Sequence, residues 1–345
     1  MTKLHPGRLT DLHVLRFELL ATPFSVLTEI PLSDAAAATV ATGREEIREA
    51  LAGRDPRLVV IAGPCSIHEA DSALEYAERL MALRTACAER LIVVMRAYFE
   101  KPRTTVGWKG LIYDPARDES YDVNRGLREA RRILLEINAL GLPCATEFLD
   151  PIVPQYTADL VAWAAIGART TESQTHRQLA SGLSMPVGFK NSTDGSLQAA
   201  LDAMTAALRP QAFLGIDPVG QTSIVHTSGN PDVHLVLRGG ASGPNFSVAE
   251  VAEARTQLAR VSRQPRALLV DCSHDNSGKD FRRQPEVCTE LAGRVRRGEQ
   301  GILGLMLESH LVEGRQPIGP GLTYGQSITD GCIGWSQTEE LLRGI

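Results

Sequence analysis

Four residues far apart in the sequence carry side chains that can bind a divalent transition metal. Cys65 offers a thiolate, His274 an imidazole nitrogen, and Glu308 and Asp330 offer carboxylate oxygens. This mixture of sulfur, nitrogen and oxygen donors fits Mn, Fe, Zn or Co, and it does not select among them. The spacing is too irregular for a zinc finger, so a second interpretation stays open, in which Cys65 is a small buried residue and the others are capping or rim groups. On the first interpretation, each subunit holds one divalent metal ion.

A second set of residues is cationic, and its members stand near the ends of short apolar segments or in the loops that follow them. They are Arg96, Lys101, Arg103, Arg169, Lys190 and Arg238. Several cations directed into one place would repel each other unless an anionic ligand binds among them. Any single one could instead pair with a carboxylate at the protein surface. For the whole set, a ligand that carries phosphate and carboxylate groups together is the better explanation.

The segment YFEKPRTTVGWKG, residues 98–110, is dense in Lys, Arg, Thr and Gly. Lys101, Arg103 and Thr104 could clasp a second phosphorylated substrate, with Pro102 stiffening the backbone between them. The alternative is a surface loop with solvated charges. Two anion sites beside one metal ion suggest a reaction that joins a phosphorylated aldehyde to a phosphorylated carboxylic nucleophile.

Eight short apolar segments must position these residues. They are RLVVIAGP, LIVVMR, LPCATEFL, VAWAAIGAR, PVGFKN, VHLVLRGG, ALLVDCSH and GILGLMLES, and they carry or directly precede Cys65, Arg96, Glu147, Arg169, Lys190, Arg238, His274 and Glu308. Amphipathic stretches lie between several of them, at residues 70–90, 123–138, 195–208 and 247–261. Alternating strands and helices, with strands that are apolar almost throughout, predict an α/β fold: a (β/α)8 TIM barrel. A doubly wound open sheet is the second choice. It would gather the polar residues at one switch point, whereas here each apolar segment carries or precedes one, as expected for a barrel.

Two parts of the chain are additional to the strands and helices of a minimal barrel. Residues 1–40 precede the first apolar segment and resemble an arm rather than a domain. Residues 211–230 have turn residues flanked by β-formers, which predicts an inserted β-hairpin. We therefore expect an N-terminal arm over residues 1–40 and a catalytic barrel over residues 41–345 that includes the hairpin.

The composition is that of a globular protein that acts on small molecules. Hydrophobic residues make up 43% and charged residues 22% of the 345-residue chain, which is enough apolar material for a large core. A net charge of -5 without a long basic cluster argues against nucleic acid or membrane as a partner. The six cysteines form no CxxC pair, and the N-terminus lacks the apolar segment of a secretion signal, so we expect a cytoplasmic protein.

Eight motifs, in order along the chain, closely resemble those of the microbial type I 3-deoxy-D-arabino-heptulosonate 7-phosphate (DAHP) synthases. They are GPCSIH at 63–68, YFEKPRTTVGWKG at 98–110, AAIGARTTESQTHR at 164–177, GFKNSTDGS at 188–196, VLRGG at 236–240, DCSHDNSGKDFRRQ at 271–284, ESHLVEG at 308–314 and SITDGCIGW at 327–335. The resemblance implies a metal-dependent transferase that condenses phosphoenolpyruvate with erythrose 4-phosphate and water. The products would be DAHP and phosphate, in the first step of the shikimate pathway.

The resemblance also implies roles for individual residues. The family's metal ligands fall on Cys65, His274, Glu308 and Asp330. Its phosphoenolpyruvate contacts fall on Arg96, Lys101, Glu147, Arg169, Lys190 and Arg238. Its erythrose 4-phosphate contacts fall on Lys101, Pro102, Arg103, Thr104 and Asp330. We hypothesise that Lys101 donates a proton to the aldehyde oxygen, and that it forms the catalytic set with Cys65, His274 and Asp330.

Regulated members of the family bind an aromatic amino acid between the arm and the hairpin. The corresponding positions here are Asp11, Pro154, Gln155, Ser184, Phe213 and Gly215. Phenylalanine-sensitive relatives carry Ser where this chain has Gly215, so the resemblance favours tyrosine as the inhibitor. It also implies a homo-oligomer, either a dimer or a tetramer.

Four positions depart from the usual motifs, namely Ala97, Tyr113, Ser192 and Asp275. Asp275 matters most, because a carboxylate beside His274 could raise the basicity of the imidazole or alter the metal preference. Two rival functions stay open. One is the related synthase that uses arabinose 5-phosphate, although its loop differs from KPRTT and it lacks the arm and the hairpin. The other is a catalytically silent barrel that senses metabolites, which would have no need of a Lewis acid.

Overall fold

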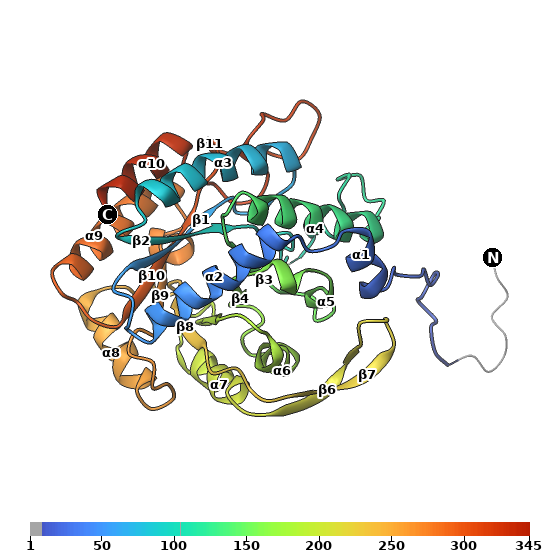
Figure 1. Ribbon diagram of the computed structural model, residues 1–345, viewed down its shortest axis with the longest axis horizontal. Coiled ribbons are helices and arrows are strands. Elements are labelled where there is room, and N and C mark those ends of the chain that lie inside the picture. Colours follow the sequence, from blue (N-terminus) through green and yellow to red (C-terminus); the bar gives the residue numbers. More distant parts are fainter. Residues whose placement is uncertain (1–8, 104) are drawn as a thin grey trace.

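The structure, a computed structural model that describes residues 9–103 and 105–345, has a closed barrel at its centre (Figure 1). Eight parallel strands form it in the spatial order β1-β10-β9-β8-β5-β4-β3-β2. Their bounds are β1 Leu58–Gly63, β2 Leu91–Arg96, β3 Cys144–Glu147, β4 Trp163–Ile166, β5 Val187–Lys190, β8 Val233–Leu237, β9 Leu268–Asp271 and β10 Ile302–Glu308. The predicted TIM barrel is confirmed, and each predicted apolar segment contains one of these strands.

Helices surround the barrel and return the chain from one strand to the next (Figure 1). They are α3 Ala70–Ala86, α4 Val123–Ala139, α5 Pro154–Thr157, α6 Gln174–Gly182, α7 Gln198–Ala207, α8 Val248–Leu258, α9 Gln284–Arg296 and α10 Trp335–Gly344. Short 3-10 helices, η1 Ala158–Leu160, η2 His274–Ser277 and η3 Phe281–Arg283, add to them. Across the part of the chain that the structure describes, none of the helices has both the length and the apolar character needed to cross a membrane.

Both faces of the barrel strands are buried. In β1, Val59 and Ile61 belong to the cluster inside the barrel, whereas Val60 belongs to the cluster under the helices. Strands buried on both faces need apolar residues at successive positions, which explains the continuous apolar segments. Helix α2, Asp34–Leu51, closes the amino-terminal end of the barrel, where Leu51 joins the interior cluster.

Three further parts lie outside the barrel. They are α1 Pro23–Glu29, the hairpin of β6 Gln211–Ile216 and β7 Thr222–Thr227, and the small sheet of β11 Val312–Arg315 and β12 Gln326–Ser327. The inserted hairpin was predicted and is confirmed. Its turn lies beside α1, where the backbone N–H of Phe24 donates to the carbonyl of Pro218 at 2.7 Å. Residue 40, where we expected the arm to end, lies inside α2, which runs without a break from Asp34 to Leu51.

A buried arginine joins α1 to the barrel. The guanidinium of Arg131 in α4 forms two hydrogen bonds with the carboxylate of Asp159, at 2.7 and 2.8 Å. It also donates to the carbonyls of Ile30, at 2.8 Å, and Tyr156, at 2.9 Å. Because Ile30 caps the carboxyl end of α1, this one side chain ties α1 to α4.

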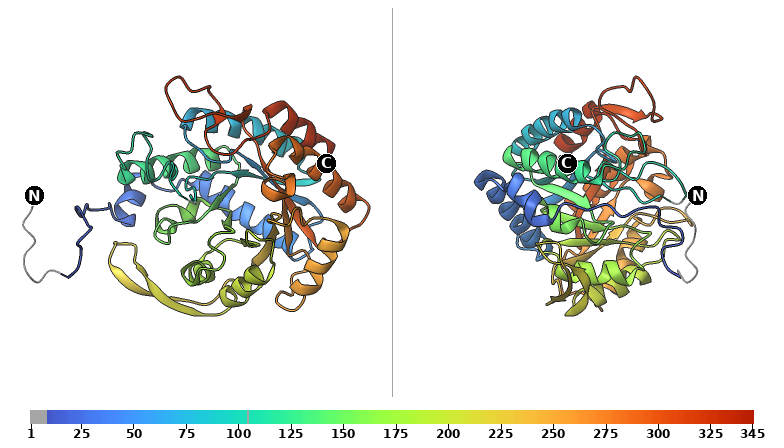
Figure 2. Two further views of the ribbon diagram at one scale, coloured as in Figure 1. Left: turned by 180° about the vertical axis from the view of Figure 1, so that it is seen from behind. Right: turned by 90° about the vertical axis from the view of Figure 1, so that its right-hand side faces the viewer.

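The chain from residue 9 to residue 20 extends away from the barrel (Figure 2). From residue 9 to residue 20 it has neither helix nor strand. Large apolar side chains on it are exposed, among them Leu15, Phe17 and Leu19. This segment therefore contributes nothing to the core of one subunit.

Candidate active site and metal centre

The carboxyl ends of the strands carry most of the predicted side chains. Arg96, Glu147, Lys190 and Glu308 are the last residues of their strands, and Arg238 directly follows β8. Since parallel strands end at the same rim of a barrel, these side chains converge there. A cavity of about 1090 Å³ opens at this rim. Its lining includes Arg169, Arg238, His274, Asp275, Glu308 and Asp330.

Three of the four predicted metal ligands lie together. The ligand atoms of Cys65, Glu308 and Asp330 are all within 4.8 Å of one another. They meet because β1 and β10 are neighbours, with Gly63 in register with Glu308. The thiol of Cys65 lies 3.5 Å from Oδ2 of Asp330. One sulfur and two carboxylate groups form a donor set that suits a divalent transition metal.

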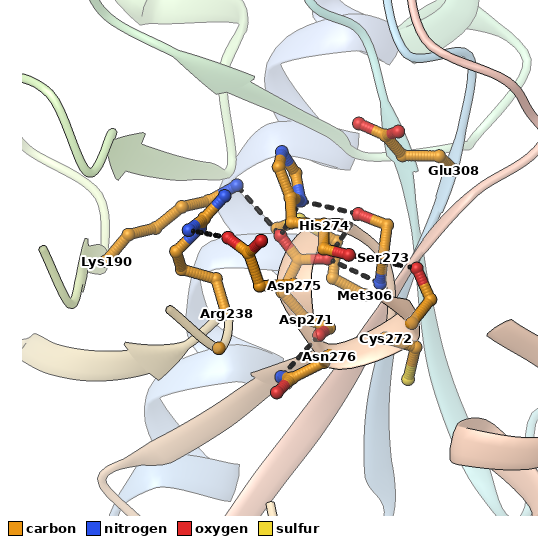
Figure 3. Close-up of polar contacts among 12 residues, drawn as sticks. Lys190, Arg238, Asp271, Cys272, Ser273, His274, Asp275, Asn276, Met306 and Glu308 are labelled. Atoms are coloured by element: carbon orange, nitrogen blue, oxygen red, sulfur yellow. Dashed lines mark hydrogen bonds and ion pairs between the residues drawn. The ribbon is translucent and has the colours of Figure 1, made fainter. Parts of the chain in front are cut away.

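Among the residues that the structure describes, this group of three does not include His274. The Nδ1 atom of His274 lies 3.0 Å from Oδ2 of Asp271 and 2.6 Å from Oγ of Ser273 (Figure 3). A carboxylate at Nδ1 fixes the ring and leaves Nε2 as the nitrogen that can bind a metal ion. His274 lines the same cavity as Glu308 and Asp330, so it faces the group without joining it.

Lys101 lies directly beside the thiol. Its Nζ is 3.1 Å from Sγ of Cys65 and 3.3 Å from the carbonyl oxygen of the same residue. Burial alone would lower the pKa of Lys101, but the Cys65 thiol and the Glu308 carboxylate raise that pKa above its ordinary value. Burial and Glu308 raise the pKa of Cys65, whereas Lys101 lowers it. The ammonium group therefore stays protonated and offsets part of the charge of a thiolate.

Arg96 is buried beside the metal-capable group, which is the set of Cys65, Glu308 and Asp330. It donates to Glu308 at 3.0 Å and to the carbonyls of Pro64 and Cys65 at 3.1 and 3.2 Å. Its guanidinium carbon stands 3.5 Å from the centre of the Tyr98 ring. Burial opposes the charged form, but Tyr98 and Glu308 raise the pKa of Arg96 above its ordinary value. A charged guanidinium is thus fixed at the rim from several sides.

Lys190 and His274 share one carboxylate, that of Asp271. The Nζ of Lys190 lies 2.9 Å from Oδ2 of Asp271, which is the atom nearest to the imidazole. Although burial would raise the pKa of Asp271, Lys190 and His274 hold it well below its usual range. Our sequence reasoning missed Asp271. Its signal was an acidic residue within the apolar segment ALLVD, where burial demands a cationic partner.

Arg238 pairs with Asp275, at 2.5 Å between Nη1 and Oδ2 (Figure 3). An effect of Asp275 on the basicity of His274 or on the metal preference stays a prediction. The carboxylate that contacts Nδ1 of His274 is that of Asp271, and the carboxylate of Asp275 points toward Arg238. Lys279 lies 3.5 Å from the other carboxylate oxygen.

Glu147 and Arg169 differ in burial. Glu147 ends β3 and is buried, and its carboxylate occupies the space that a Cβ atom at residue 167 would need, so Gly167 makes room for it. Arg169 stands three residues beyond the end of β4 and is exposed. Its guanidinium donates to the carbonyl of Pro102 at 3.4 Å, which places it next to the loop after β2.

The loop of residues 98–110 folds back on itself. The Nε of Arg103 donates to the carbonyl of Trp108 at 2.7 Å, and the backbone N–H of Lys101 donates to the carbonyl of Lys109 at 2.9 Å. Thr104 lies outside the described residues. Burial would raise the pKa of Asp330, but Lys101, His274 and Arg103 lower it. Two cations of the loop, Lys101 and Arg103, therefore stabilise the charged form of Asp330.

A buried carboxylate within this loop, that of Glu100, was not predicted. Glu100 accepts the backbone N–H of Asp150 at 2.9 Å and that of Leu149 at 3.2 Å. Burial raises the pKa of Glu100 to about 8, against those two hydrogen bonds and with support from the charges of Asp150 and Glu147. The hydroxyl of Tyr113, one of the unusual residues, lies 3.1 Å from Oδ2 of Asp150 and 3.4 Å from Oε1 of Glu100.

The two other unusual residues make local contacts. Ala97 is fully buried directly after β2. Ser192 donates to the carbonyl of Ser196 at 3.0 Å and to the carboxylate of Asp194, which closes the turn after β5.

The predicted effector positions come from four parts of the chain. Pro154 begins α5 and is buried, and Gln155 beside it is exposed. Ser184, after α6, is exposed, and its carbonyl accepts a hydrogen bond from Arg48 at 2.8 Å. In β6, Phe213 and Gly215 are half-buried. The backbone of Asp11 has a φ of 55°, and its carbonyl accepts the N–H of Val14 at 3.2 Å.

The closed barrel, with a thiol, carboxylates and buried cations at the carboxyl ends of its strands, has the architecture of a TIM-barrel enzyme for anionic substrates. Residues 30–343 match the DAHP synthetase I family, and the chain belongs to this family.

Named proteins support the assignment. The Tyr-sensitive phospho-2-dehydro-3-deoxyheptonate aldolase of Escherichia coli (strain K12) is 52% identical over 340 residues, which cover 98% of this chain and 95% of that protein. The Phe-sensitive protein of the same organism is 53% identical over 337 residues, which cover 97% of this chain and 96% of that protein. The solved structure of the aldolase from Francisella tularensis SCHU S4 superimposes with a TM-score of 0.94 at 45% identity, covering 96% of this chain and 97% of that one.

Proposed function

We propose that this chain is a transferase that condenses phosphoenolpyruvate with D-erythrose 4-phosphate and water, and releases DAHP and inorganic phosphate. In a member of the DAHP synthetase I family, this is the first step of the shikimate pathway. The observation that carries the proposal is the position of Nζ of Lys101, 3.1 Å from the thiol of Cys65, which belongs to a group of residues that could bind a metal ion, at a rim that also presents buried arginine and lysine side chains.

One divalent metal ion would be held by Cys65, Glu308 and Asp330, with Nε2 of His274 as the fourth ligand. When bound, such an ion supplies a Lewis acid for the aldehyde oxygen. The donor set supports this role because it combines soft and hard ligands and includes an imidazole whose other nitrogen is already fixed. Mn, Fe, Zn and Co all fit these donors.

The substrates would lie among the cations of the rim. Phosphoenolpyruvate would contact Arg96, Lys101, Glu147, Arg169, Lys190 and Arg238, and erythrose 4-phosphate would contact Lys101, Pro102, Arg103, Thr104 and Asp330. Lys101 would donate its proton to the aldehyde oxygen while the bond forms between C3 of phosphoenolpyruvate and the aldehyde carbon. Water then adds at C2, and the carbon–oxygen bond to phosphate breaks.

Release of inorganic phosphate from phosphoenolpyruvate tests this function. We expect release that requires erythrose 4-phosphate, stops with a chelator and returns when a divalent metal is added back. Equal activity with arabinose 5-phosphate would favour the related sugar-acid synthase. Binding of phosphoenolpyruvate without turnover, at saturating metal and acceptor, would favour a silent sensor.

We infer further that an aromatic amino acid inhibits the enzyme, with tyrosine preferred. The resemblance supports tyrosine, because phenylalanine-sensitive relatives carry Ser where this chain has Gly215. An enzyme that is unaffected by millimolar tyrosine but inhibited by phenylalanine or tryptophan would overturn the preference.

A homo-oligomer, dimer or tetramer, is supported by the segment before α1. Its exposed apolar residues, including Leu15, Phe17 and Leu19, fit a contact with a second copy of the chain. Light scattering of the full chain should give a mass that falls when Phe17 and Leu19 are both changed to Ser. A wild-type chain that is monomeric at micromolar concentration would contradict this.

A further inference from the structure

Asp275 differs from the other carboxylates at the rim in how it is held. Asp271 is fully buried and accepts hydrogen bonds from the backbone N–H of Ser273, at 3.0 Å, and from its hydroxyl, at 2.7 Å. In the described part of the chain, the carboxylate of Asp275 has only two polar partners, the side chains of Arg238 and Lys279. Lys279 is largely exposed, so the ion pair with Arg238 is what holds Asp275 in place.

Arg238 is the cation that Asp275 neutralises. It is buried to more than nine-tenths and lines the cavity, and its backbone N–H is fixed by Asn191 at 2.8 Å. A buried guanidinium without a partner is costly, and the ion pair with Asp275 offsets that cost. A phosphate or carboxylate group that binds the planar fork of Arg238 through Nη1 meets the carboxylate of Asp275 at the same nitrogen. Ligand and Asp275 therefore compete for Arg238.

We propose that Asp275 is an internal counter-ion that occupies Arg238 until a substrate anion displaces it. The inference rests on the proposed binding of phosphoenolpyruvate at this rim. Displacement costs the ion pair and leaves a carboxylate beside the bound anion, so Asp275 lowers the affinity for phosphoenolpyruvate.

Calorimetric titration of the metal-loaded protein with phosphoenolpyruvate alone tests the inference without turnover. Asp275→Ala and the isosteric Asp275→Asn should each bind about tenfold more tightly than the wild type, which corresponds to about 1.4 kcal/mol. The matched control is Asp280→Ala, which removes a carboxylate that lines the same cavity but pairs with Arg282. It should leave the affinity within about twofold, as expected of an exposed pair.

The outcomes separate the two proposals. A wild type that does not bind phosphoenolpyruvate would contradict the proposed function. If the wild type binds phosphoenolpyruvate and the Asp275 variants bind it equally well or more weakly, Asp275 is not a competing counter-ion. Weaker binding by the variants would show instead that Asp275 positions Arg238. If Asp280→Ala binds phosphoenolpyruvate as tightly as the Asp275 variants do, the counter-ion proposal is also overturned. The tighter binding would then come from the loss of a negative charge anywhere in the cavity. In steady state, the Asp275 variants should lower KM for phosphoenolpyruvate more than they change kcat.

Discussion

Replacement of Lys101 by Met tests the chemistry of the site most directly. The variant keeps much of the side-chain volume and removes the ammonium group that lies 3.1 Å from the thiol of Cys65. A positioned general acid contributes about 10²- to 10⁴-fold to a rate, so we expect kcat to fall by at least about 100-fold, or about 3 kcal/mol in the barrier.

The same substitution should weaken the metal site. At an effective dielectric constant of about 20, a charge 3.1 Å from a thiolate is worth up to about 5 kcal/mol before desolvation is subtracted. Because Lys101 lowers the pKa of Cys65, its loss raises that pKa further and disfavours the thiolate. The variant should therefore need more metal for half-saturation, and its kcat must be measured after a metal titration.

Lys101→Arg is the matched control, since it keeps the charge but gives up a proton far less readily. Phosphate release at saturating metal and substrates gives kcat, and calorimetry gives the affinity for phosphoenolpyruvate. We expect Lys101→Arg to retain binding within about tenfold and to lose kcat as Lys101→Met does. A Lys101→Met variant with near wild-type kcat and only a raised KM would refute the proton-donor role.

Three further predictions concern stability and regulation. Burial raises the pKa of Glu100 from 4.5 to about 8, so the folded state binds a proton that the unfolded chain loses, and stability should fall between these pH values by about 5 kcal/mol. Thermal unfolding of Glu100→Gln between pH 5 and 9 should lack this loss, and parallel pH profiles of the variant and the wild type would contradict it. Arg131→Met removes the donor to the carbonyls of Ile30 and Tyr156 and to the half-buried carboxylate of Asp159, so it should cost about 1–3 kcal/mol in urea unfolding. Arg128→Met removes an exposed pair and should cost less than about 1 kcal/mol; equal losses would argue against this role of Arg131. Gly215→Ser should weaken inhibition by tyrosine relative to phenylalanine, and an unchanged ratio of inhibition constants would remove Gly215 from the selectivity.

The sequence predicts best those side chains that a strand positions directly. Arg96, Glu147, Lys190 and Glu308 each end a strand whose apolar segment is plain in the sequence, and a buried parallel strand leaves little choice of direction. Arg169 stands in a turn beyond its strand and is exposed, and the apolar pattern of the strand carries no information on burial there.

The orientation of His274 and Asp275 could not be predicted, because a local backbone conformation decides it. His274 has a φ of 55°, in a region that few residues with side chains adopt, and it begins the 3-10 helix η2. There the imidazole of His274 turns back to Asp271, and the carboxylate of Asp275 turns toward Arg238, which directly follows the neighbouring strand β8. Two residues that are adjacent in the sequence, His274 and Asp275, thus pair with different partners.

The hairpin of β6 and β7 forms its own two-stranded sheet, half-exposed and separate from the strands of the barrel. Mutations in such an appendage can accumulate without disturbing the packing on which the reaction depends. Response to an end product can then drift between amino acids while the chemistry is inherited unchanged. The two Escherichia coli relatives fit this view, since they are named for different amino acids yet resemble this chain almost equally. Overall identity is therefore a poor guide to the inhibitor, and the few residues that face the effector are the ones to compare.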